Sequence, residues 1–160
     1  MEMARLRLIR RLLLRFRQID NRRRALLVEA VAGLLAARLA LIFVPFPRLA
    51  GRIGTVVPPT DPRAAQAKAL MTDRETLLAE DIGWAVTRAA RYVPFDAVCL
   101  PQAMAARVML RRRGVASVMH FGAARGDNSP LDTHAWLDAA GVEVTGYPVA
   151  KGFAEIACFI

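Results

Sequence analysis

Residues 96–114 read DAVCLPQAMAARVMLRRRG, and this stretch combines a helical pattern with a cysteine near its start. The spacing of its apolar residues predicts a helix over about 98–113. Pro101 is tolerated only in the first turn, where its missing N–H is not needed. Gly114 follows the basic end, where a left-handed capping residue is expected. Cys99 therefore lies at the N-terminus of the predicted helix.

A cysteine in this position is suited to nucleophilic chemistry. Unpaired N–H groups and the positive end of the helix dipole stabilise a thiolate, which is the nucleophilic form of the side chain. The same N–H groups can bind an oxyanion, and Gln102 either assists there or is a surface residue. Asp96 precedes the helix and can cap it. The alternative is that Cys99 is simply a core side chain.

The pattern changes from helical to extended after the glycine. Three segments show the composition of strands, with a turn at Gly141 between the last two: 115–124, 132–140 and 142–147. Upstream, residues 74–92 predict a helix with an acidic start and a basic end. Residues 150–160 are apolar and fit either element. We therefore expect one helix pair followed by an antiparallel sheet.

Both histidines lie on successive predicted strands. A helix that begins with cysteine, followed by strands that carry histidine, is the plan of papain-like and transglutaminase-like sites. His134 stands next to a polar loop and is the preferred base, whereas His120 is in mid-strand, and either can be structural. Trp136 is a core residue or a pocket wall. The cysteines and histidines lack zinc-finger spacing, and no Walker-type phosphate loop is present, so we expect neither metal nor cofactor.

The positive charge is concentrated at the start of the chain. The net charge is +9, and residues 1–24 carry nine arginines against two acidic residues, a balance of +7. Arginine alternates there with apolar residues at helical spacing. This pattern fits a membrane-surface helix, a nucleic-acid patch, a docking helix for an acidic partner, or a solvated face with an apolar stripe packed on the body.

The next stretch, residues 25–46, is apolar and long enough to span a bilayer. Glu29 and Arg38 would both be costly in the membrane, so the pattern favours a buried helix of a soluble protein. Five prolines and two glycines in residues 45–62 then predict an extended connector. The chain has two cysteines and a poor match to a signal peptide, so we expect a cytoplasmic protein with reduced thiols.

Taken together, the sequence resembles the leader peptidases of lasso-peptide biosynthesis, specifically the stand-alone peptidase of the split B-type maturation proteins. The resemblance rests on WAVTRAARYVPFDAVCLPQAMAARVMLRRRG (84–114) and THAWLDAAG (133–141). It extends to EAVAGLLAARLALIFVPF (29–46) and RLAGRIG (48–54). Its most specific parts are the CLPQAMA helix start and the HAW strand, about 35 residues apart.

The resemblance implies an α+β fold in which an N-terminal helical region precedes a transglutaminase-like, papain-like cysteine-protease core. It implies that the catalytic helix packs on an antiparallel sheet, with Cys99 as nucleophile and His134 as general base. The expected organisation is a helical region for partner docking (1–50), a connector (51–63) and the peptidase core (64–160). The substrate would be the leader region of a ribosomally made precursor peptide, commonly with Thr at the next-to-last leader position.

The resemblance also implies partners. A small recognition protein would bind the leader, and an ATP-dependent macrocyclase would join the freed amine to an Asp or Glu side chain. Nucleic acid is not expected as a partner. Two rival hypotheses remain: a non-catalytic helical scaffold or membrane-peripheral adaptor, and an acyltransferase or transglutaminase on the same fold, in which an amine resolves the acyl-thioester.

The sequence departs from the family at the third catalytic position. The family has an acid roughly a dozen residues after the histidine, where this chain has Gly146 and Tyr147. Glu143 and Asp138 are the nearest acids and the candidates to orient His134. Asp138 shares a strand face with His134 but is too far along the strand for direct contact. A backbone carbonyl or a water could take the same role.

Overall fold

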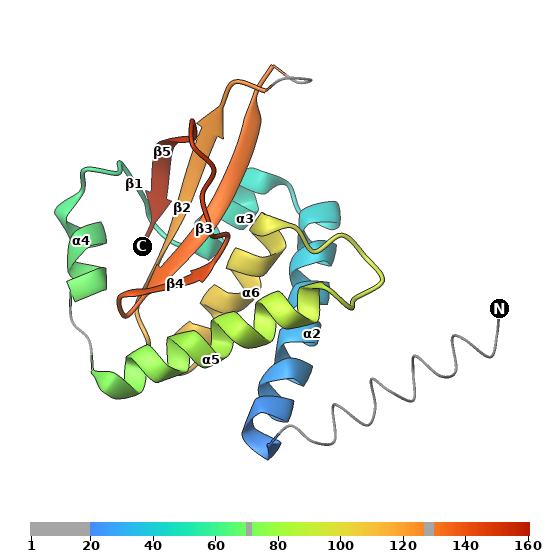
Figure 1. The fold of residues 1–160 in the computed structure, drawn as a ribbon. Helices are drawn as coiled ribbons and strands as arrows, with labels where there is room; N and C mark the ends of the chain where they lie inside the picture. Colours follow the sequence, from blue (N-terminus) through green and yellow to red (C-terminus); the bar gives the residue numbers. More distant parts are fainter. Residues whose placement is uncertain (1–19, 70–71, 127–129) are drawn as a thin grey trace.

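The computed structural model describes residues 20–69, 72–126 and 130–160 (Figure 1). Within these ranges the elements follow one another as α2 (Asn21–Phe43), α3 (Phe46–Ile53), β1 (Val56–Val57), α4 (Pro62–Ala69), α5 (Asp73–Ala90), α6 (Cys99–Arg111), β2 (Ser117–Ala124), β3 (Asp132–Ala139), β4 (Val142–Thr145) and β5 (Ala154–Phe159). The predicted helices and the three predicted strands are confirmed, and the ambiguous C-terminal segment is strand β5. The α+β fold is confirmed. The arginine-rich stretch before residue 20 lies outside the described residues.

The sheet places β2 at its centre. Its five strands are ordered β1-β5-β2-β3-β4, and each neighbouring pair is antiparallel. In Figure 1, α2, α5 and α6 lie on one side of the sheet and α4 lies on the other. Leu137 and Ala139 belong to the core shared with the three helices, whereas Val118 and Cys158 pack with Ala64 of α4. Side chains of a strand alternate between faces, so β3 divides its residues between these two layers.

Helix α2 is half core and half surface. Leu26, Leu27, Ala30, Leu34 and Ala37 are buried against the other helices. Glu29 is paired with Arg113 at the end of α6, at 2.6 Å, and this hydrogen bond lowers the pKa of the carboxyl. The expected buried helix is thus realised on one face. By length and composition α2 also resembles a membrane-spanning helix. Of the most apolar 18-residue segment of α2, 22% is buried in the protein.

The connector is more ordered than its prolines predict. Residues 46–53 form α3, because a proline in the first helical turn needs no hydrogen-bond partner for its nitrogen. Val56 and Val57 then pair with β5. At Gly54 a Cβ would lie 2.4 Å from the Ile160 carbonyl oxygen, so the end of α3 approaches the C-terminus closely.

Arg107 of α6 ties these elements together. Its half-buried guanidinium donates to the carbonyl oxygens of Ile53 at 2.9 Å, Ser117 at 2.8 Å and Phe159 at 3.1 Å. Burial lowers the pKa of this group. The three bonds connect α3, β2 and β5 to the helix that begins with Cys99.

We expect Arg107→Ala to lower the free energy of unfolding by about 2–4 kcal/mol, because it removes three charge-assisted bonds at once. Urea unfolding measures the change. Arg111→Ala, on the exposed side of the same helix, is the matched control and should cost less than about 1 kcal/mol. Equal losses in the two variants would contradict the bracing role of Arg107.

Candidate active site

Cys99 is the first residue of α6 and is half-buried. No side chain caps this helix, in contrast to α5, where Thr72 and Glu75 form a reciprocal capping box. The first-turn N–H groups of α6 therefore keep their hydrogen-bonding capacity for another acceptor. The prediction that Asp96 caps this helix is wrong, because no side chain caps it and the Asp96 carboxylate pairs with Arg38 of α2 at 3.3 Å.

The turn that carries the cysteine is held by its own residues. Pro101 is buried in the first turn, as predicted from its missing N–H. The Gln102 side-chain amide donates to the Ala97 carbonyl at 2.6 Å. Gln102 thus fixes the chain as it enters the helix, and its alternative role in binding an oxyanion stays a prediction. The bond from Gln102 to Ala97 fixes the segment that leads into Cys99, the first residue of the helix.

His134 lies on β3 and makes a hydrogen bond that defines its tautomer. Its Nε2 is 2.6 Å from the carbonyl oxygen of Gly146. A carbonyl only accepts, so Nε2 carries the hydrogen, and in the neutral ring Nδ1 holds the lone pair. The ring also packs against Trp136 and Phe153, with centroids 5.9 and 5.5 Å away. In the neutral ring Nδ1 is therefore the nitrogen that can accept a proton.

Asp138, one of the two candidate carboxylates, bonds to other side chains. Asp138 accepts a hydrogen bond from the Tyr147 hydroxyl and lies 3.3 Å from Nε2 of His120. Burial and this carboxylate raise the pKa of Tyr147. Glu143 is exposed, and its backbone lies opposite that of Asp138 in the β3–β4 register. The ring hydrogen bond of His134 goes to the Gly146 carbonyl, which is the backbone alternative named above.

The predicted nucleophile and base are not joined by a hydrogen bond in the parts of the chain that the structure describes. Strand alternation puts His134 and Trp136 on the face of β3 away from Leu137, whose side chain packs in the core with α6. Their pairing in catalysis stays a prediction. Helix α6 packs against β3, so the helix that carries Cys99 and the strand that carries His134 are in contact.

The cysteine–histidine contact that the structure does show is a different one. Cys158 Sγ lies 3.5 Å from His120 Nδ1, and the two residues are paired across β5 and β2. Their exposed fractions are 1% and 4%, so a peptide substrate has no access to this thiol. Both cysteines are thiols rather than a disulfide, as expected. No partner of His120 could be predicted from local patterns, because only the strand register brings Cys158 opposite it.

Trp136 connects the two histidines. It is 8% exposed, and its ring stacks on His120 at 5.4 Å and on His134 at 5.9 Å. The prediction of a core residue or pocket wall is thereby resolved as a core residue that supports both imidazoles. The aromatic stack fixes where the His134 ring lies along β3.

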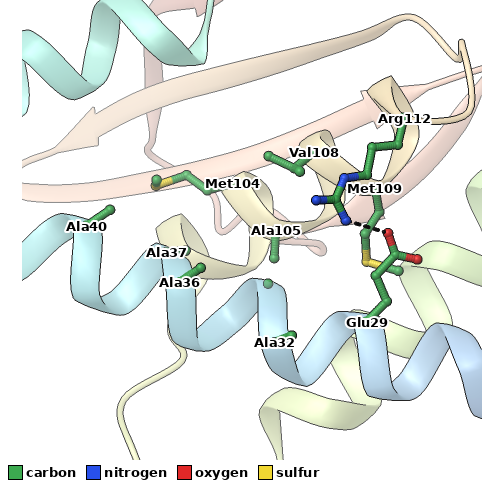
Figure 2. A pocket seen from close by; sticks show the side chains of 11 residues that line it. Glu29, Ala32, Ala36, Ala37, Ala40, Met104, Ala105, Val108, Met109 and Arg112 are labelled. Atoms are coloured by element: carbon green, nitrogen blue, oxygen red, sulfur yellow. Dashed lines mark hydrogen bonds and ion pairs between the residues drawn. The ribbon is translucent and has the colours of Figure 1, made fainter.

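Two surface hollows lie beside the helices and the sheet that carry the candidate site residues. One, of about 410 Å³, lies between α2 and α6 and is lined mainly by alanine and methionine, with the 3.3 Å pair of Glu29 and Arg112 at one end (Figure 2). The other, of about 350 Å³, lies between α5 and β4 and includes Gly146 and Tyr147 in its wall. The second hollow is thus next to the carbonyl that orients His134.

Comparison with protein families identifies the superfamily of the chain. The sequence model of the transglutaminase-like superfamily matches residues 40–158, which covers most of the chain and includes α3 through β4, most of β5 and both predicted catalytic residues. Neither a curated protein nor a solved structure matches the chain.

Proposed function

The chain belongs to the transglutaminase-like superfamily, and from this premise we propose that it is a cysteine peptidase with Cys99 as nucleophile and His134 as base. Enzymes of this superfamily usually depend on a cysteine. The observation that carries the proposal is the Nε2–Gly146 bond of His134, which leaves Nδ1 as the proton acceptor. The position of Cys99 also supports the proposal, because this residue lies half-buried at a helix N-terminus that no side chain caps.

The proposed reaction is hydrolysis of an amide. The reaction requires the His134 ring to reach the Cys99 side of β3 when substrate binds, because the structure places this ring on the opposite face, stacked on Trp136. Nδ1 of His134 then takes the thiol proton of Cys99, and the sulfur attacks the scissile carbonyl. The N–H groups of Cys99 and Leu100 bind the oxyanion that forms; Pro101 has no N–H to offer. The imidazolium then gives its proton to the departing amine, and water hydrolyses the acyl-thioester that remains on Cys99.

The proposed substrate is the precursor of a lasso peptide. On the resemblance described above, the enzyme cuts between leader and core and frees the core α-amine for a macrocyclase. A separate recognition protein presents the leader, and residues 1–50 are the candidate docking region for these partners. The apolar and basic character of this region supports docking, and the substrate and partners rest on the sequence resemblance.

The experiment is a cleavage assay with full-length protein, the recognition protein and a synthetic precursor peptide. We expect mass spectrometry to find a free leader acid and a free core amine, with cleavage lost when the next-to-last leader Thr is replaced. An added small amine tests acyl transfer: a leader amide as the main product would establish the acyltransferase. If the folded protein does not cleave the precursor peptide when the recognition protein is present, the result contradicts peptidase activity. It would then favour the non-catalytic scaffold.

A further inference from the structure

The buried cluster around His120 has the composition of a metal site. His120 Nδ1, Cys158 Sγ and a Glu155 carboxylate oxygen all lie within 4.8 Å of one another. The thiol donates to Glu155 Oε1 at 2.7 Å, and His120 Nδ1 contacts the same oxygen. The three residues come from β2 and β5, on the face of the sheet opposite α6.

The spacing agrees with tetrahedral coordination. Zinc–sulfur and zinc–nitrogen bonds of about 2.3 and 2.0 Å at a tetrahedral angle separate the two ligand atoms by about 3.5 Å. The observed distance between Cys158 Sγ and His120 Nδ1 is 3.5 Å. Only the Glu155 oxygen is too close to its neighbours, and it belongs to a long side chain that keeps 31% of its surface exposed to solvent. A rotation of that side chain opens the centre of the cluster.

The surroundings match those of a metal-bound histidine. The other ring nitrogen, Nε2, is buried and faces Asp138 Oδ2 at 3.3 Å, although the two are not aligned as a good hydrogen bond. A carboxylate on the outer nitrogen of a ligating histidine fixes its tautomer and raises its basicity. Asp138 is in turn held by the Tyr147 hydroxyl. Trp136 stacks on the ring and fixes its plane.

We propose that His120, Cys158 and Glu155 bind a divalent transition metal, with Zn²⁺ as the best fit. The set of one imidazole, one thiolate and one carboxylate suits zinc and its spectroscopic substitute Co²⁺ better than Mg²⁺ or Ca²⁺, which prefer oxygen ligands. Three protein ligands leave the fourth tetrahedral position to water. Binding expels the thiol proton, so affinity rises with pH. The metal would fasten the C-terminal strand β5 to the central strand β2.

The test is a Co²⁺ titration of the metal-free full-length protein, followed by displacement with Zn²⁺ against a chromophoric chelator. We expect one equivalent of Co²⁺ with a thiolate-to-cobalt absorption band. Cys158→Ser should remove the band and weaken Zn²⁺ binding at least about 100-fold. Asp138→Asn should weaken it about 10–100-fold while the band remains. Cys99→Ser, which changes the other thiol, is the control and should leave both readouts unchanged.

Glu155→Gln guards against misfolding, because this side chain is partly exposed to solvent and its change preserves size. It should weaken Zn²⁺ binding while the free energy of unfolding of the metal-free protein changes by less than about 1 kcal/mol. Two outcomes overturn the proposal: no stoichiometric metal on the folded wild-type protein, or undiminished binding by Cys158→Ser. Either outcome would establish the cluster as a hydrogen-bonded core without a metal. Neither bears on the cleavage reaction, which uses Cys99.

Discussion

Cys99→Ala is expected to lower the rate of precursor cleavage at least about 10³-fold, because removing the nucleophile of a cysteine or serine hydrolase leaves only binding and oxyanion stabilisation. Cys99→Ser should fall nearly as far, since a hydroxyl is a far weaker nucleophile than a thiolate. The rate is measured under single-turnover conditions by mass spectrometry of the released leader. Urea unfolding of each variant checks that the fold survives.

Two controls make this loss specific. Val108→Ala changes an exposed residue of the same helix and should cleave at the wild-type rate. Cys158 is 1% exposed, so a brief alkylation of the native protein should modify Cys99 alone and inactivate it in proportion to labelling. Full activity in folded Cys99→Ala, or activity that survives complete labelling of Cys99, would remove this residue from the mechanism.

The local elements follow from the sequence because each is set by neighbours in the chain. Pro101 fixes the start of α6, and the αL residue Gly114, with φ 74°, fixes its end. The Ala140–Gly141 pair, both with positive φ, makes the turn between β3 and β4. Alternation in 132–140 places His134, Trp136 and Asp138 on one face of the strand before any tertiary contact is known.

The remaining features depend on register and packing, which no local pattern encodes. Cys158 and His120 are 38 residues apart and meet only because β5 inserts between β1 and β2. The hydrogen-bond acceptor of His134 is a main-chain carbonyl, and such a group has no residue type by which a sequence could reveal it. Residues 46–53 fold into α3 against the expected break, since Leu49 and Ile53 gain a core to pack on.

Gly146→Ala is the second large effect we expect, and it tests the link between the backbone and the base. Gly146 has φ 83°, and a Cβ there would lie 2.4 Å from the Ala135 carbonyl oxygen and 2.8 Å from Trp136 Cβ. The left-handed backbone and the clash together should lower the free energy of unfolding by about 2–4 kcal/mol. The shift of the chain also moves the carbonyl that holds Nε2 of His134, so cleavage should slow by at least tenfold in protein that remains folded.

The matched control for this variant is Gly114→Ala. Gly114 has a similar φ of 74°, but nothing lies within 4 Å of its added Cβ, so it should cost about 1 kcal/mol and leave cleavage unchanged. Nitrogen NMR of the His134 ring reads the tautomer directly: in the wild type Nε2 carries the hydrogen, and in Gly146→Ala the preference should weaken. If both glycine variants lose equal stability and His134 keeps its tautomer, the Gly146 carbonyl does not orient the base, and a water or a substrate group must do so instead.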